Sequence, residues 1–294
     1  MTKGSERKKI AFVGLGNMGS PMAARLVSAG YDVAGADLAP AARTALTDAG
    51  GRAFENVVDA VQDAQIVILM LPNSDVVESV LLGQPTMSRV AADAVVVDMS
   101  SSEPLRTRKL AETLRTDFNV GLIDAPVSGG VKGAVNGTLT IMTGGTQEQV
   151  ELVSECLTHL GTVRHTGPVG SGHAIKAFNN LLSATHLLVT SEALLAGERF
   201  GLDMEIMLEV INSSSGRSGS TENKWPNFIL TESYNSGFGL QLMLKDMKIA
   251  TNLAAQLGLP SLLGEDSARL WEKAAKALPA GADHTEIARW LRDQ

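Results

Sequence analysis

The sequence of 294 residues predicts an α/β domain with a mainly parallel sheet, followed by an all-helical domain. Short apolar runs alternate with helical patterns in the first part of the chain, and helical patterns alone follow. The apolar runs are continuous, which is typical of strands that are covered on both faces. The change of pattern near residues 170–173 predicts a first domain over 1–171 and a second over 172–294.

The first domain is predicted to open with a strand, a tight turn and a helix. The apolar run KIAFV ends in GLGNMG, and PMAARLVSAG then has helical spacing, with a glycine suited to the C′ position. We expect further strands over 31–37, 64–72, 94–101, 120–127 and 138–145, and a helix over 147–161.

The second domain is predicted to contain helices only. A long helix is expected over 174–199, roughly 26 residues or about 39 Å in length. The patterns MEIMLEVINSS, WPNFILTES, LQLMLKDMKIATNLAAQLG, LLGEDSARLWEKAAKAL and HTEIARWLRD predict shorter helices after it. Residues 213–224 are strongly polar and are expected to form a loop.

Composition excludes several classes of function. The net charge of -7 argues against a nucleic-acid surface, because such surfaces use Lys and Arg to neutralise phosphates. The single cysteine, Cys156, rules out an intrachain disulfide and a cysteine-cluster metal site, so we expect no metal and a cytoplasmic, reducing environment. The charged N-terminus lacks a signal-peptide pattern, and no apolar run is long enough for a membrane span, so no membrane partner is expected.

A dinucleotide fingerprint, G-x-G-x-x-G, lies between the first strand and the first helix. Gly14 can make the tight turn, Gly16 can let the backbone approach a pyrophosphate, and Gly19 can let the helix pack on the strand. The helix N-terminus offers free N–H groups to the phosphates. The six residues are Gly14, Leu15, Gly16, Asn17, Met18 and Gly19.

An acidic residue follows at the expected place. Asp37 closes the second strand, 18 positions after Gly19, where it can accept hydrogen bonds from the adenosine ribose. A carboxylate there would repel a 2′-phosphate, which favours NAD, while the nearby Arg43 leaves NADP open. The alternative is a glycine turn and a strand-end aspartate that bind no ligand.

Five motifs together resemble one family. GLGNMG, MLPN (70–73), DAPVSGG (124–130), GSGHAIKAFNN (170–180) and LKDMKIA (244–250) are similar, in this order, to motifs of the β-hydroxyacid dehydrogenases, which include 3-hydroxyisobutyrate dehydrogenase and tartronate semialdehyde reductases. The resemblance extends over nearly the whole chain. It implies a Rossmann-like N-terminal domain and an all-α C-terminal domain, joined by a long interdomain helix, with the active site in the cleft.

Lys176 is the candidate general acid/base. Oxidation of a hydroxyl by hydride transfer leaves a proton that a nearby group must accept. Burial and a cationic nicotinamide ring would lower the pKa of this lysine from its ordinary value of about 10.4. A lysine whose head reaches solvent is the alternative. Asn180 lies one helical turn further on the same face, and the resemblance implies that it positions the substrate and the lysine.

Other site residues are expected around the substrate and the cofactor. The backbone amides of Ser128, Gly129 and Gly130 can converge on a substrate carboxylate, although a plain turn is the alternative. The resemblance implies that Ser101 contacts nicotinamide and substrate, and that Leu71 and Pro72 run beside the ribose and nicotinamide.

Two further residues are expected to reach the cofactor from the second domain. By resemblance, Lys245 extends to the active site and the cofactor, with Asp246 beside it. A local charge pair on the helix surface is an equal alternative for this lysine. Phe238, just before the same predicted helix, is expected to close over the cofactor.

The sequence therefore predicts an NAD-dependent dehydrogenase of a short β-hydroxy acid, such as 3-hydroxyisobutyrate, L-serine or threonate. One alternative is an NAD(P)H-dependent reductase of glyoxylate, succinic semialdehyde or tartronate semialdehyde, and another is an inert dinucleotide-binding module. The polar segment 213–224 suggests a polyhydroxylated or second-anion substrate, unless it is an exposed loop. The long apolar helix suggests a homodimer or homotetramer.

Overall fold

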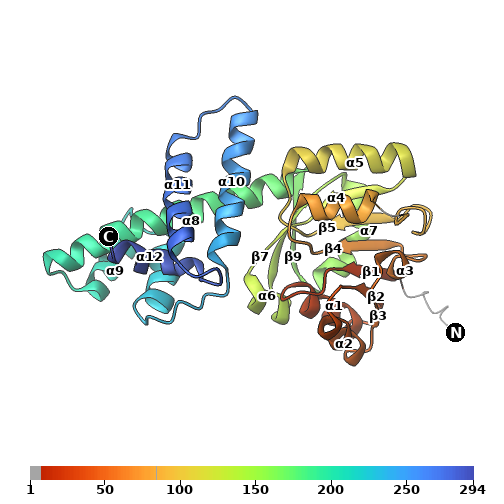
Figure 1. The fold of residues 1–294 in the computed structure, drawn as a ribbon, viewed down its shortest axis with the longest axis horizontal. Helices are drawn as coiled ribbons and strands as arrows, with labels where there is room; N and C mark the ends of the chain where they lie inside the picture. The colour runs from red at the N-terminus through yellow and green to blue at the C-terminus, as the bar shows by residue number, and fades with distance from the viewer. Residues whose placement is uncertain (1–7, 84) are drawn as a thin grey trace. The chain divides into compact units, whose positions relative to one another are not determined.

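The structure is a computed structural model that describes residues 8–83 and 85–294. It divides into two compact units, Met1–Lys176 and Ala177–Gln294, so that the division falls inside helix α8 (Ser171–Phe200) (Figure 1). The expectation about a signal peptide concerns residues 1–7, which lie outside the described part. Among the described residues, no helix is both long and apolar enough to cross a membrane.

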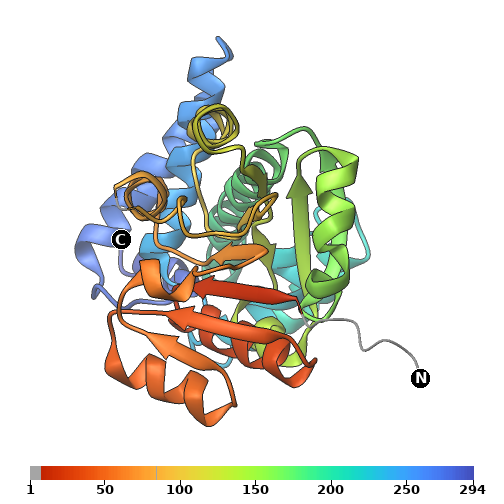
Figure 2. The ribbon, with the colours of Figure 1, turned by 90° about the vertical axis from the view of Figure 1, so that its right-hand side faces the viewer.

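The first unit is built on a nine-stranded sheet with the order β3-β2-β1-β4-β5-β6-β8-β7, in which β9 pairs with β8. The strands β1 to β6 pair in parallel, as the arrows of β1 and β2 show in Figure 2. Their bounds are β1 (Lys9–Val13), β2 (Asp32–Ala36), β3 (Arg52–Phe54), β4 (Ile66–Leu69), β5 (Val95–Asp98), β6 (Gly121–Asp124), β7 (Val127–Ser128), β8 (Leu139–Gly144) and β9 (Gly161–Gly167).

The sheet is mainly parallel, as the apolar runs indicated, and its antiparallel pairings all involve β8. β8 runs antiparallel to both β6 and β7 and parallel to β9. Only residues 129–138 separate β7 from β8, which is too few for a parallel crossover, so the chain returns antiparallel. The strands β3 and β9 were not predicted, because β3 is short and β9 has many exposed residues.

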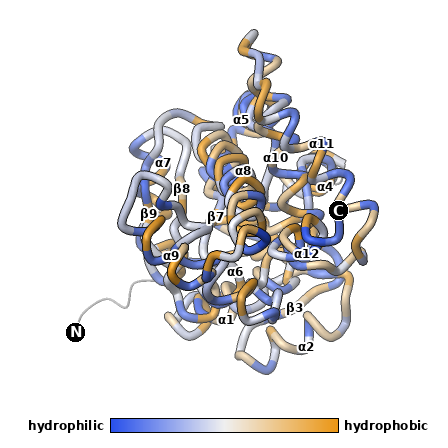
Figure 3. Tube along the Cα trace, turned by 90° about the vertical axis from the view of Figure 1, so that its left-hand side faces the viewer, coloured by the Kyte–Doolittle hydropathy of each residue, from blue (hydrophilic) through white to orange (hydrophobic). Residues whose placement is uncertain are grey.

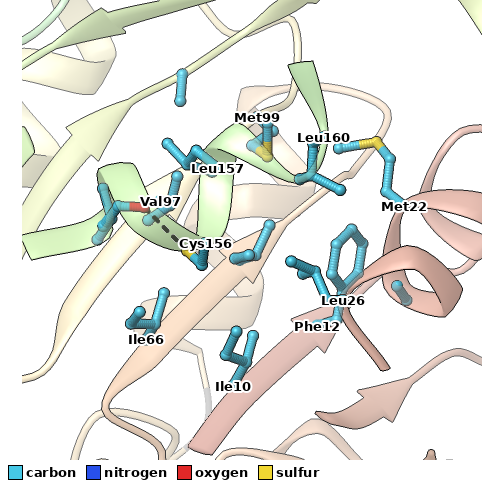
Figure 4. Close-up of a cluster of buried hydrophobic side chains, with 14 of the residues drawn as sticks. Ile10, Phe12, Met22, Leu26, Ile66, Val97, Met99, Cys156, Leu157 and Leu160 are labelled. Atoms are coloured by element: carbon cyan, nitrogen blue, oxygen red, sulfur yellow. Dashed lines mark hydrogen bonds between the residues drawn. The ribbon is translucent and has the colours of Figure 1, made fainter. Parts of the chain in front are cut away.

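Helices connect the strands, and apolar cores cover both sheet faces, as the apolar runs indicated. Ile10 and Phe12 of β1 belong to one buried cluster, whereas Ala11 and Val13 of the same strand belong to another. Figure 4 shows the first cluster, in which the thiol of Cys156 donates to the carbonyl of Val153 (3.0 Å). The connecting helices are α1 (Gly19–Ser28), α2 (Pro40–Asp48), α3 (Val57–Ala60), α4 (Ser74–Leu82), α5 (Pro104–Phe118), α6 (Gly130–Asn136) and α7 (Gln147–Thr158).

The second unit is helical, as predicted, and packs around Trp225 and Trp271, both fully buried. It contains most of α8, then α9 (Met204–Asn212), the π-helix η1 (Ser220–Ile229), α10 (Leu240–Gln256), α11 (Leu262–Ala277), the short η2 (His284–Glu286) and α12 (Ile287–Arg292). The expectation of a loop over 213–224 was wrong in its second half. Ser220 and Thr221 are buried at the start of η1, because the buried Trp225 anchors this helix in the core.

A buried histidine lies in the second unit next to charged groups. The Nδ1 atom of His284 lies 3.0 Å from both the carbonyl of Phe238 and the hydroxyl of Ser236. Burial lowers the pKa of His284 from 6.5 to about 4; the charge of Lys224 lowers it further and that of Asp283 opposes the change. His284 is therefore neutral in the folded protein at neutral pH.

The stability of the second unit should fall in mild acid because of His284. The unfolded chain takes up a proton on this imidazole near pH 6.5, whereas the folded protein resists it down to about pH 4. The contribution is present above pH 6.5 and is lost as the pH falls toward 4, by about 3 kcal/mol at most. Denaturant unfolding followed by tryptophan fluorescence reports on this unit, which contains all three tryptophans.

The matched control is the exposed His159. We expect His284→Gln to lower stability at neutral pH and to flatten the loss between pH 6.5 and 4, while His159→Gln leaves the pH profile unchanged. Equal profiles for the wild type and His284→Gln would contradict the assignment.

Candidate active site

The carboxyl ends of the parallel strands define one edge of the sheet in the first unit. The strand order reverses between β1 and β4, which is where open α/β sheets bind ligands. Segments 14–19, 70–73 and 99–102 follow β1, β4 and β5 at this edge, and 125–130 follows β6. The fold therefore brings the predicted residues of the first unit to the same edge.

The glycine-rich loop and Asp37 are in direct contact. The backbone N–H of Leu15 donates to Oδ2 of Asp37 (2.7 Å), and that of Ala39 donates to Oδ1 (2.8 Å). Each carboxylate oxygen keeps a second lone pair for a ribose hydroxyl. The side chain of Leu15 is buried in the core, so this residue can meet a ligand only through its backbone, whereas Gly16 and Asn17 are exposed.

Arg43 is held by protein groups. Its Nη1 donates to the carbonyls of Asp37 (2.8 Å) and Leu38 (2.9 Å), and its Nη2 donates to Glu55 (3.2 Å). The sequence left NADP as an alternative because Arg43 could bind its 2′-phosphate. In the structure these hydrogen bonds engage the guanidinium of Arg43 with protein groups. The acidic end of β2 therefore favours NAD, with NADP less suited.

The three glycines of the fingerprint differ in the space around them. A Cβ on Gly14 would lie 2.3 Å from the carbonyl oxygen of Met70, and one on Gly19 would lie 1.9 Å from that of Gly14. A Cβ on Gly16 would meet no protein atom within 4 Å. Met18 is the N-cap of α1 and makes no side-chain cap, so the helix N-terminus keeps donors for an anion. The loop thus fits a dinucleotide pyrophosphate at Gly16.

A network of short hydrogen bonds connects the loops after β4 and β5. The backbone N–H of Leu71 donates to Oγ of Ser100 (2.9 Å), and that of Ser100 donates to Oδ1 of Asp98 (3.0 Å). The hydroxyl of Ser102 donates to Oδ2 of Asp98 (2.8 Å). Ser101 lies between these fixed residues and is half-buried, while Pro72 is exposed at the neighbouring loop.

The Ser128-Gly129-Gly130 segment begins at the last residue of the two-residue strand β7, which continues the line of β6 along β8. Gly129 and Gly130 have positive φ values of 127° and 61°, which side chains with a Cβ adopt with strain. Gly130 begins α6, and a Cβ there would meet no atom within 4 Å. The backbone at this turn is thus open to a small anion.

Asp124 fixes the start of α8. This fully buried carboxylate accepts the N–H groups of Gly170 (2.6 Å) and His173 (2.8 Å). Burial raises its pKa, and the nearby His173 and the two N–H bonds oppose this rise. The cap explains why α8 begins at Ser171, three residues before the predicted start, and it places Lys176 in the second turn with 8% of its surface exposed.

In the second unit, Asn180, Lys245 and Asp246 come together. The Nδ2 atom of Asn180 donates to Oδ2 of the buried Asp246 (2.6 Å), and Nζ of Lys245 lies 3.5 Å from Oδ1. The contact between Lys245 and Asp246 is the local charge pair that the sequence analysis gave as one alternative for Lys245. Phe238 packs edge-on against His284, with ring centroids 5.8 Å apart.

Sequence reasoning missed the buried groups behind the site. Asp98 and Asp124 close the apolar runs VVVD and GLID, and an acid at the end of a buried strand was an available signal. The buried His173, near the start of α8, was not among the predicted site residues. No signal in the sequence indicated that Asp246 binds Asn180. Among the described residues, no group of His, Cys, Asp or Glu could hold a metal ion.

Comparison with known proteins assigns the family. Residues 9–191 match the family model for the NAD binding domain of 6-phosphogluconate dehydrogenase, and residues 170–291 match that for the NAD-binding domain of NADP-dependent 3-hydroxyisobutyrate dehydrogenase. Relatives that are more than 30% identical over nearly the full chain are named hydroxyacid dehydrogenases or aldehyde reductases. The chain belongs to the β-hydroxyacid dehydrogenase family. It is therefore an NAD(P)-dependent oxidoreductase that acts on a hydroxyl group.

Individual relatives cover most of this β-hydroxyacid dehydrogenase. It is 39% identical to 2-(hydroxymethyl)glutarate dehydrogenase of Eubacterium barkeri over 86% of this chain and 84% of that protein. It is 36% identical to the NAD-dependent L-serine dehydrogenase of Pseudomonas aeruginosa over 96% and 97% of the two chains. A solved structure of Mycobacterium tuberculosis 3-hydroxyisobutyrate dehydrogenase with L-serine is 31% identical, with a TM-score of 0.92 over 98% of this chain and 100% of that one.

Gly16 and Gly19 should respond differently to an added methyl group. Gly16→Ala places it in open space, so we expect an unchanged melting temperature and a Kd for NADH raised by at least about tenfold, or about 1.4 kcal/mol. Gly19→Ala forces it against the carbonyl of Gly14, so the melting temperature itself should fall. Thermal melts without ligand and NADH fluorescence titrations measure both. Normal NADH binding by Gly16→Ala would exclude a pyrophosphate at this glycine.

Proposed function

We propose that this enzyme oxidises the hydroxyl of a short β-hydroxy acid with NAD, and that Lys176 accepts the hydroxyl proton. The observation that carries the proposal is the position of Lys176. It is buried, and it follows by one turn a helix start that Asp124 fixes to the sheet. A buried amine beside a cofactor edge suits proton exchange with an alcohol oxygen.

The roles of the cofactor residues follow from their places in the first unit. NAD, when bound, supplies the acceptor for the hydride. We assign the pyrophosphate to the backbone of Gly14–Gly19 and the adenosine ribose to Asp37. Leu71, Pro72 and Ser101, on the loops after β4 and β5, are assigned to the ribose and nicotinamide side. Phe238 and Lys245 of the second unit remain assigned to the cofactor.

The remaining residues hold the substrate and the proton acceptor. The open backbone of Ser128, Gly129 and Gly130 is assigned to the substrate carboxylate, since converging N–H groups bind anions. Asn180 positions the lysine and the substrate, and its hydrogen bond to Asp246 fixes its amide. In this arrangement the neutral amine of Lys176 takes the proton during oxidation and returns it during reduction.

The named substrates of the relatives narrow the substrate class. 2-(Hydroxymethyl)glutarate, L-serine and 3-hydroxyisobutyrate all carry a primary hydroxyl on the carbon β to a carboxylate. We propose that this chain acts on the same fragment and releases a semialdehyde. A screen with NAD and NADP over 3-hydroxyisobutyrate, L-serine, threonate and 2-(hydroxymethyl)glutarate, in both directions, tests this. Activity confined to the reduction of glyoxylate or succinic semialdehyde would overturn it.

Replacement of Lys176 tests the proton acceptor. Lys176→Ala should lower kcat by at least about 10²-fold on the best substrate, because general acid–base catalysis contributes roughly this much. The Kd for NADH should stay near that of the wild type. Lys109→Ala removes an exposed lysine of α5 and is the matched control, with unchanged kcat. A kcat for Lys176→Ala close to that of Lys109→Ala would remove Lys176 from the mechanism.

We also propose that the enzyme is a homodimer or homotetramer. The long helix α8 carries exposed apolar side chains at Phe178, Leu182, Val189 and Phe200. At 100° per residue these four lie within about 40° of one another around the helix. Figure 3 shows orange, hydrophobic positions recurring along α8. Such a stripe on one helix is suited to an isologous contact with a second copy.

Charges on this stripe should separate the copies. Leu182→Glu with Val189→Glu places two carboxylates in the apolar stripe, so light scattering should give about the chain mass of 30.9 kDa instead of a multiple of it. Leu152→Glu, at an exposed leucine of α7, is the control and should keep the assembly. A wild-type protein that scatters as a monomer would contradict the proposal.

The cytoplasm is our proposed compartment. The single cysteine leaves the chain without an intrachain disulfide, as is usual in a reducing environment. Burial raises the pKa of Cys156 to about 12, so the thiol is unreactive at neutral pH.

A further inference from the structure

A buried histidine next to the proposed proton acceptor has no role in the reaction described above. His173 lies three residues before Lys176 and is 1% exposed. Its Nδ1 lies 2.9 Å from the hydroxyl of Thr107 on α5, and its Nε2 lies 3.1 Å from the carbonyl oxygen of Ser100. Both ring nitrogens therefore have partners on elements other than α8.

The surroundings allow this ring a single orientation. Asp98 lies 3.7 Å from Nε2, and Asp124 lies 3.9 Å from Nδ1. The carbonyl of Ser100 only accepts hydrogen bonds, so Nε2 must carry a proton and donate it there. The backbone N–H of His173 is at the same time bound to Asp124. A rotation of the imidazole would leave buried polar groups without partners, which is costly.

The imidazole connects α8 to the loop that holds other site residues. Ser100 accepts from His173 through its carbonyl oxygen and from the N–H of Leu71 through its hydroxyl. Asp98 fixes the backbone N–H of Ser100 and the hydroxyl of Ser102, on either side of Ser101. Three residues of helix advance about 4.5 Å along the axis, so Lys176 lies one turn from this connection.

We propose that His173 is a positioning residue, which sets the amine of Lys176 relative to the Ser100–Ser102 loop and Leu71. The proposal rests on the proposed function of Lys176. Asp124 fixes the backbone at the start of α8. The ring of His173 fixes the rotation of α8 about its axis and its position along that axis, relative to the Ser100–Ser102 loop. A displacement of about 1 Å in such a group can cost about 10²-fold in rate. A histidine that only fills the core would contribute to stability alone.

Three variants separate positioning from stability. His173→Leu removes both ring bonds, Thr107→Val removes only the partner of Nδ1, and His173→Gln keeps an amide N–H that can reach Ser100. The matched control is Thr86→Val, which removes the hydroxyl of another fully buried threonine, one bonded to the carbonyl of Val80 (2.7 Å). All are assayed below their melting temperatures.

We expect His173→Leu to lower kcat by about 10- to 100-fold, with the KM for NAD within about threefold of the wild type. Thr107→Val should show a smaller loss, and His173→Gln should recover part of it. Thr86→Val should lower the melting temperature as Thr107→Val does and keep its kcat. Equal kcat values for His173→Leu and Thr86→Val would overturn the proposal.

A double-mutant cycle distinguishes this proposal from that for Lys176. If His173 acts through Lys176, His173→Leu should cause little further loss in the Lys176→Ala background. Full additivity of the two losses would overturn the positioning role and leave the role of Lys176 standing. A normal kcat for Lys176→Ala alone would instead reject the proposed function.

Discussion

The two hydrogen bonds from the start of α8 to Asp124 are the constraint on which the position of Lys176 depends. A helix N-terminus leaves N–H groups without intrahelical partners, and here two of them reach one carboxylate at the end of β6. The positive end of the helix dipole favours an acceptor oxygen at this position. Because β6 belongs to the sheet, these bonds fix the start of α8, and with it the backbone of Lys176, relative to the sheet.

The glycines before Lys176 serve this same contact. A Cβ on Gly172 would lie 2.1 Å from the carbonyl oxygen of Met142 in β8, so no other residue lets the helix start touch that strand. Gly170 has a positive φ of 89°, at the turn that delivers its N–H to Asp124. The glycines of GSGHAIK thus allow the backbone at the start of α8 to approach that of β8. Lys176 is buried because this start of the helix is buried.

The features that follow from contiguous residues could be predicted from the sequence, and those that need distant pairs could not. The fingerprint, the strand ending at Asp37 and the helical second unit are each determined by a local pattern. The antiparallel β8 and the Asp124 cap depend on residues far apart in the chain, since 46 positions separate Asp124 from Gly170. The same holds for Asn180 and Asp246, which are 66 positions apart. The periodicity of neighbouring residues cannot reveal contacts between residues so far apart in the chain. Only the resemblance to a family indicated that the motifs containing Asp124, Asn180 and Asp246 contribute to one site.

The bond between Asn180 and Asp246 also determines which atom of the asparagine is available for chemistry. A carboxylate only accepts hydrogen bonds, so the amide must present its NH₂ group to Asp246, and the two ends of the side chain are no longer interchangeable. Oδ1 accepts from Asn179 (3.1 Å) and keeps a second lone pair. On a helix, Asn180 and Lys176 lie on the same face, so this oxygen suits an ammonium or a hydroxyl donor. The amide of Asn180 therefore offers an acceptor on the face of α8 that carries Lys176, whereas an aspartate there would repel the carboxylate of Asp246.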